Sequence, residues 1–123
     1  MVFYTIVTFD KKPYGIINHM KATLTYKAKE IDPDGFITEM VIGALPTQNA
    51  ERPHGLKYRL YYGNVLSNCI VRYDNEAGKG DHKHIGDREE PYQFETVEKL
   101  VADFMADIEK LTYTGGYHEE SKY

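Results

Sequence analysis

The run Asp81-His82-Lys83-His84 is the part of the chain best suited to chemistry. In an extended segment, residues two apart point the same way, so His82 and His84 converge on one ion, phosphate or scissile group. Histidine both gives and takes a proton near neutral pH. The pair therefore predicts acid–base chemistry, with the open alternative that an H-x-H in a polar loop is simply solvated.

Cationic side chains near the histidines would stabilise charge developing on a phosphate. We predict a catalytic set consisting of His82, His84, Arg72, Arg59 and Asp74. Further contacts with nucleic acid are expected from Lys57, Lys79, Lys83, Arg88 and Tyr92. Tyr61 is a second candidate, beside Tyr92, for stacking on a base.

A metal site would need a third ligand. Asp74 or Asp81 beside the two histidines would give three ligands and an open position, as in catalytic zinc or iron centres. The chain has one cysteine and neither an H-E-x-x-H nor a C-x-x-C pattern. A metal-independent route needs only a general acid, a general base and cationic groups near the phosphate, and the chain has side chains of these types. We therefore predict no metal and no cofactor.

Charge is unevenly distributed along the 123 residues, whose net charge is -4. Residues 52–88 hold seven Lys or Arg against four acids, whereas residues 89–123 carry a net charge of -6. The overall balance argues against a protein that coats nucleic acid through bulk electrostatics. A basic, histidine-bearing middle is thus followed by an acidic C-terminal third.

Strands must position these side chains, and alternation of apolar and polar residues predicts them. An opening strand is expected at 2–9, and a half-buried strand at 20–30. The composition of 32–35 predicts a turn, followed by a strand at 36–42. Residues 43–55 are predicted to form a long connecting loop.

A second hairpin is predicted at 56–73, with Gly63-Asn64 as a two-residue turn. If Tyr62 pairs with Val65, then Arg59 lies opposite Asn68 and Lys57 opposite Ile70. One face then carries Lys57, Arg59, Asn68, Arg72 and Asp74. The other face carries Leu56, Tyr58, Leu60, Tyr62, Val65, Cys69, Val71 and Tyr73. A slip of one residue would destroy this assignment.

Residues 75–90 are predicted to be an irregular loop or a short extended segment. Thr96 is expected to cap an amphipathic helix that Gly115-Gly116 ends. The fold class is therefore α+β: an antiparallel sheet of two hairpins and an N-terminal strand, with a C-terminal helix packed on one face. We expect a single domain, 1–123, with its core in about 2–112 and a flexible tail at 113–123.

The remaining sequence features concern the compartment. A single cysteine, Cys69, allows no internal disulfide and is expected to pack as a small hydrophobe. No run approaches the roughly 20 apolar residues that span a bilayer. We therefore expect a cytoplasmic protein with no membrane partner, in which His19, His54 and His118 are surface residues.

The stretch 58–107 resembles the TumE family of toxins from type II toxin-antitoxin pairs. The resemblance rests on Tyr58-Arg59-Leu60, Arg72-Tyr73-Asp74-Asn75, Gly80-Asp81-His82-Lys83-His84, Glu90-Pro91-Tyr92-Gln93-Phe94 and Asp103-Phe104. The N-terminal half gives no comparable match. The resemblance implies a TumE-like domain that inhibits growth and is neutralised by a cognate antitoxin.

Three functions remain open at this stage. The first is a metal-independent ribonuclease, with RNA as substrate. The second is a non-catalytic inhibitor that binds nucleic acid or protein, and the third is a metal-dependent hydrolase. A homodimer is a further open alternative, in which the acidic helix masks the basic face.

Overall fold

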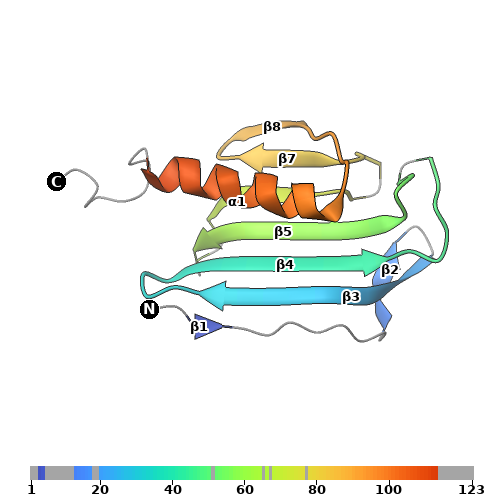
Figure 1. Ribbon diagram of the computed structural model, residues 1–123, viewed down its shortest axis with the longest axis horizontal. Coiled ribbons are helices and arrows are strands. Elements are labelled where there is room, and N and C mark those ends of the chain that lie inside the picture. Colours follow the sequence, from blue (N-terminus) through green and yellow to red (C-terminus); the bar gives the residue numbers. More distant parts are fainter. Residues whose placement is uncertain are drawn as a thin grey trace. The chain divides into compact units, whose positions relative to one another are not determined.

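The computed structural model describes residues 3–4, 13–17, 20–50, 52–64, 66, 68–76 and 78–113. The chain divides into two compact units, residues 1–93 and 94–123. The first contains an antiparallel sheet and the second contains one helix, as Figure 1 shows. The predicted α+β class, with an antiparallel sheet and a C-terminal helix, is confirmed.

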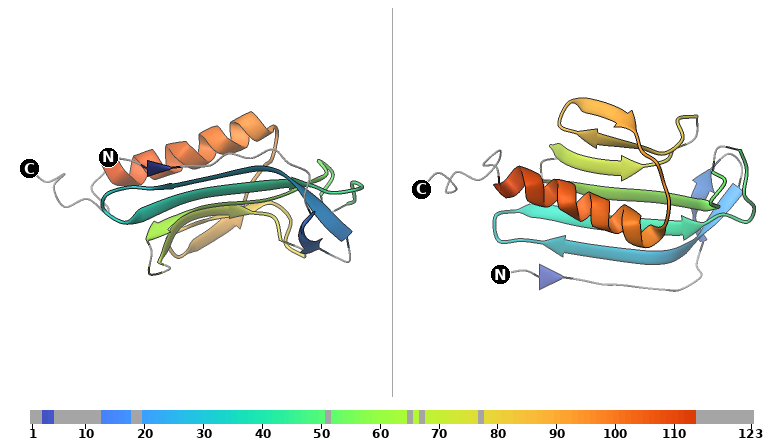
Figure 2. Two further views of the ribbon diagram at one scale, coloured as in Figure 1. Left: turned by 90° about the horizontal axis from the view of Figure 1, so that it is seen from below. Right: turned by 45° about the horizontal axis from the view of Figure 1, so that its top comes forward.

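The sheet has eight strands in the order β1-β3-β4-β5-β6-β7-β8, with β2 also paired to β3. The elements are β1 Phe3–Tyr4, β2 Pro13–Ile17, β3 Met20–Ile31, β4 Phe36–Ala44, β5 Leu56–Asn64, β6 Cys69–Asp74, β7 His82–Ile85, β8 Arg88–Pro91 and α1 Val97–Tyr113. Figure 2 shows the strands from β3 onward lying side by side in chain order. Neighbours along the chain are therefore neighbours in the sheet.

The first hairpin, β3 and β4, forms where alternation predicted it. The Asp32 carboxylate accepts hydrogen bonds from the backbone N–H groups of Asp34 and Phe36, at 2.9 and 3.0 Å. Gly35 has φ of 88°, which favours glycine at this turn. Of the predicted opening strand only β1 is described, and the rest lies outside the described residues.

The predicted register of the second hairpin is wrong. Tyr62 pairs with Val71, and Arg59 pairs with Asp74. Strand β5 runs on through Asn64, whose side chain accepts hydrogen bonds from two backbone N–H groups of the following turn. The connection is therefore longer than two residues. The register moved by an even number of residues, so the face of each side chain in the paired stretch from Arg59 to Tyr62 was still predicted correctly.

Cys69 is the exception to the predicted faces. A register shift between Tyr62 and Gly63 pairs Gly63 with Cys69. An irregularity of this kind changes which residues share a face, so Cys69 lies on the side of the sheet that carries Arg59. The thiol is half-buried, and this burial raises its pKa, which keeps it in the unreactive protonated form.

A third hairpin lies in the segment 75–90, for which an irregular loop or a short extended segment was predicted, and the extended alternative is the one observed. Strand β7 pairs with β6 on one side and with β8 on the other. The sequence His82–Ile85 has too few apolar residues to predict a strand by alternation. Its backbone groups nevertheless form hydrogen-bonded ladders with both neighbours, which stabilise the extended conformation.

The apolar face of the second hairpin is buried, as predicted. Its buried residues are Tyr58, Leu60, Tyr62, Val71 and Tyr73, each at most 5% exposed. Removing such side chains from water is the main stabilising contribution to a fold of this kind. The other face of the same strands is left for polar side chains.

The helix α1 begins as predicted. The backbone N–H of Lys99 donates to the Thr96 hydroxyl at 3.0 Å, which is an N-cap hydrogen bond. Leu100, Phe104 and Ile108 are buried along one stripe of the helix. Within the described ranges, no helix is both long and apolar enough to cross a membrane. Gly115-Gly116 and the predicted tail beyond them lie outside these ranges.

Candidate functional site

Pairing between β6 and β7 brings the predicted catalytic residues together. Arg72 lies opposite His84, and Asp74 lies opposite His82. Directly opposed residues of an antiparallel ladder share a face, so these four side chains lie on one side of the sheet. The predicted convergence of the histidines is confirmed, since their ring centroids are 5.2 Å apart.

His82 lies between two oxygen acceptors. Its Nε2 is 2.7 Å from an oxygen of Asp74, and its Nδ1 is 2.9 Å from the carbonyl oxygen of Gly80. The ring can therefore donate from both nitrogens when it carries two protons. The side chains of His82 and Asp74 are 6% and 5% exposed. The second Asp74 oxygen is 2.9 Å from Nε of Arg72, so the buried carboxylate lies between an arginine and a histidine.

His84 has the opposite hydrogen-bonding environment. Its Nε2 is 2.8 Å from a terminal nitrogen of Arg72. A guanidinium can only donate, so Nε2 of His84 must be the acceptor and the ring must be neutral. Burial and then the positive charge of Arg72 lower the pKa of His84, although Glu89 acts in the other direction. The cluster thus holds one histidine as a hydrogen-bond donor and one as an acceptor.

Glu89 also belongs to the cluster, although its sequence position did not indicate this. One of its carboxylate oxygens is 3.5 Å from Nε2 of both histidines and 3.2 Å from Nζ of Lys79. The hydrogen bond from Lys79 lowers the pKa of Glu89. Glu89 pairs with His84 across β7 and β8, so only recognition of strand β8 could have identified it.

His82, His84 and Glu89 could also hold a metal ion, because their ligand atoms lie within 4.8 Å of one another. The chain's own cations already contact two of these three ligands. Arg72 donates to His84, and Lys79 donates to Glu89. A metal would have to displace both cations before all three residues could coordinate it.

Arg59 completes the predicted catalytic set from β5. It pairs with Asp74, and its side chain is exposed on the same face. A hollow of about 360 Å³, here called the histidine hollow, is lined by Arg59, Arg72, Asp74, Glu76, Lys79 and His82. Two strands and the connection from β6 to β7 therefore place two arginines and a lysine around one histidine and its carboxylate partner.

The predicted nucleic-acid contacts are divided between the two faces of the sheet. Lys57 lies on β5 two residues before Arg59 and therefore shares its face. Lys83 pairs with Tyr73, and its Nζ is 5.5 Å from the centroid of that ring. Tyr92 packs edge-on against the same ring, at 5.0 Å between centroids.

Arg88 lies on the side of Lys83, because it pairs with Ile85. Lys83, Arg88 and Tyr92 thus lie on the face of the sheet opposite the histidines, where the alternation of the strands directs them. Of the five predicted contacts, Lys57 and Lys79 are left beside the catalytic set, and Lys79 lines the histidine hollow.

A family model described as Toxin TumE matches residues 16–112. The chain belongs to this toxin family. The match starts in strand β2, so it extends well beyond the C-terminal half in which the sequence motifs lie. Membership of the toxin family implies an antitoxin partner. No curated protein and no solved structure matches the chain.

The TumE-family toxin has a second histidine–carboxylate pair. His54 was predicted to be a surface residue, and this prediction is wrong. Its Nε2 is 3.1 Å from Asp81, its Nδ1 accepts from the backbone N–H of Leu56, and its side chain is 12% exposed. The hydroxyl of Tyr58 also donates to Asp81, at 2.9 Å. Burial alone would raise the pKa of Asp81, but the hydrogen bonds from His54 and Tyr58 lower it overall.

Arg52 belongs to the scaffold of the toxin and not to its basic surface. The side chain is 0% exposed and donates to the carbonyl oxygen of Asn75 at 2.8 and 3.1 Å. The side-chain amide of Asn75 in turn accepts from the backbone of Tyr58 and donates to the backbone of Leu56. These bonds join the loop before β5 to the end of β6, next to Asp74.

Proposed function

We propose that this TumE-family toxin is a ribonuclease that cleaves RNA without a metal ion. The observation that carries the proposal is the contrast between the two histidines. His84 accepts a hydrogen bond from Arg72, whereas His82 faces the oxygens of Asp74 and Gly80. A neutral ring beside a donating ring is the arrangement that general base and general acid catalysis requires.

The reaction is an internal transfer at phosphorus. When Arg72 shifts its hydrogen bond from Nε2 of His84 to a phosphate oxygen, that nitrogen removes the proton of a ribose 2′-hydroxyl, and the 2′-oxygen attacks the adjacent phosphorus. The bond from phosphorus to the 5′-oxygen breaks, and His82 gives its proton to that oxygen. The products are a 2′,3′-cyclic phosphate and a 5′-hydroxyl.

Cationic side chains stabilise the charge that develops on the phosphate. Arg59, Arg72 and Lys79 line the histidine hollow and are the groups proposed to bind the phosphate oxygens. Such preorganised charges lower the barrier because they need not reorient during the reaction. Asp74 contacts both His82 and Arg72, and it is proposed to hold them in place.

Binding of RNA without cleavage is the second candidate function. It is favoured by the low exposure of His82, whose side chain is 6% exposed. In that case Arg59, Arg72 and Lys79 act through charge alone, and affinity falls as salt concentration rises.

Incubation of the purified toxin with total RNA, with and without a chelator, separates these functions. We expect cleavage that survives chelation and is lost in His84→Ala. Lys83→Ala, on the other face of the sheet, is the matched control and should retain cleavage. Intact RNA that is retained on the protein in a salt-sensitive manner would favour the binder. Cleavage that the chelator abolishes would contradict the metal-independent route.

A further inference from the structure

A row of paired residues crosses six strands on the face that carries the histidines. Each member lies directly opposite the next, and the row reads Lys29, Glu39, Tyr61, Arg72, His84 and Glu89. Paired residues share a face, so the six side chains form one continuous polar band. Tyr61 is the aromatic member of this band.

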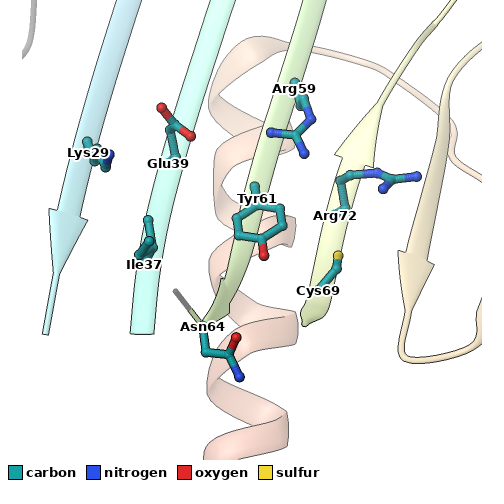
Figure 3. A pocket seen from close by; sticks show the side chains of 8 residues that line it. All are labelled: Lys29, Ile37, Glu39, Arg59, Tyr61, Asn64, Cys69 and Arg72. Carbon is teal, nitrogen blue, oxygen red and sulfur yellow. The ribbon is translucent and has the colours of Figure 1, made fainter. Parts of the chain in front are cut away.

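A second hollow lies over the middle of this row, next to the histidine hollow. It measures about 330 Å³ and is lined by Lys29, Ile37, Glu39, Arg59, Tyr61, Asn64, Cys69 and Arg72 (Figure 3). We call it the tyrosine hollow. Arg59 and Arg72 line both hollows, so the two spaces adjoin.

The Tyr61 ring lies against the sheet because Gly63 has no side chain. A Cβ atom at Gly63 would lie 2.5 Å from the Tyr61 hydroxyl oxygen and 2.8 Å from Cζ of its ring. Figure 3 shows the ring from its flat side, between the side chains of the β4 and β6 strands. The Arg59 guanidinium lies 5.0 Å from the ring centroid. A flat aromatic face is therefore available beside two arginines.

We propose that the tyrosine hollow binds the nucleobase next to the scissile phosphate of a single-stranded RNA. The inference rests on the proposed ribonuclease function and names a subsite for its substrate. Tyr61 and His84 are two strands apart in the row, which corresponds to about 10 Å. This spacing suits a base and the phosphate of a neighbouring nucleotide. The base stacks on Tyr61, while Arg59 and Arg72 neutralise the backbone between the two hollows.

The charge of the hollow favours a nucleotide over an apolar ligand. Lys29, Arg59 and Arg72 contribute three positive charges against one carboxylate, that of Glu39. Ile37 and the thiol of Cys69 provide a small apolar surface beside the ring. An aromatic face with a cationic border is the usual composition of a site for single-stranded nucleic acid.

The test measures binding without cleavage. The probe is a short fluorescent single strand of deoxynucleotides, which lacks the 2′-hydroxyl needed for the proposed reaction. Tyr61→Leu should weaken its binding about tenfold, as expected for the loss of one stacked base. Tyr61→Phe should keep the affinity. Tyr92→Leu is the control, because Tyr92 packs against Tyr73 on the opposite face.

A strand of the same length with abasic sites throughout provides the second arm. Tyr61→Leu should not change its affinity, because no base is present to stack. Equal affinity of wild type and Tyr61→Leu for the intact strand would overturn the subsite, as would equal losses on both strands. Far-UV circular dichroism checks that each variant folds. Absence of RNA cleavage by the wild-type toxin would refute the proposed function but not the subsite, since binding is measured separately.

Discussion

Two histidine–carboxylate pairs lie close together in the chain, but their surroundings differ. His82 and Asp74 line a hollow together with two arginines and a lysine. In the second pair, His54 accepts a hydrogen bond from the backbone of Leu56, and Asp81 accepts one from the hydroxyl of Tyr58. A histidine next to a carboxylate is therefore no evidence of catalysis in itself. Asp81 also lines a hollow, with Lys79 and His82, so the two arginines beside the first pair are what favour chemistry there.

The largest effect is expected from His84→Ala, which removes the histidine next to the first pair. Loss of the proposed general base should reduce RNA cleavage by about 10²- to 10⁴-fold. The variant should stay folded, because it removes one hydrogen bond, to Arg72, whose side chain is 28% exposed and can be solvated instead. Gel-based cleavage rates and urea unfolding measure the two effects. Retention of full cleavage by a folded variant would eliminate His84 as the base.

The second pair should instead affect stability. Asp81→Ala leaves the buried donors of His54 and Tyr58 without their acceptor, and we expect a loss of about 1–3 kcal/mol in the free energy of unfolding. Urea denaturation measures the loss. Asp87→Ala, an exposed aspartate in the turn between β7 and β8, is the control and should be neutral. An unchanged unfolding midpoint in Asp81→Ala would show that the second pair is not structural.

The pH dependence of cleavage tests the environment of His84. A general base must be unprotonated, so activity rises with pH through the pKa of His84. This pKa is lowered by burial and by Arg72, so the acidic limb of kcat/KM should lie below the usual histidine value of about 6.5. In Arg72→Gln the limb should move to higher pH, because a positive neighbour has been removed. A limb that stays in place would contradict the proposed role of the Arg72–His84 contact.

The smallest effect is expected from Glu89→Gln, which should act in the opposite direction. Glu89 raises the pKa of His84, so its neutralisation should move the acidic limb to lower pH. The same pH profiles provide the measurement, and Glu90→Gln, the exposed neighbour, is the control. A shift of the limb to higher pH would show that Glu89 does not act on His84 through its charge.

Local patterns predicted much of the fold and part of the site. Alternation of apolar and polar residues predicted strands β3 and β4 and the buried face of β5 and β6. The N-cap residue Thr96 predicted the start of α1. The register of the second hairpin was wrong because Gly63-Asn64 resembles a two-residue turn, whereas Asn64 continues β5 and caps a longer connection. At β7 the extended segment was predicted only as an alternative to an irregular loop, because strand pairing and not alternation stabilises it.

By itself, the sequence determined which side chains share a face in the stretch from Arg59 to Tyr62 and that the two histidines lie close together. That information is local, since the two-residue period of a strand survives an even slip in register. Tertiary structure decided the partners: Arg72 for His84, Glu89 beside both rings, and Asp81 for His54, which lies 27 positions away. These partners come from strands whose pairing depends on the whole sheet. Only that pairing distinguishes the histidines proposed for catalysis from the one that stabilises the fold.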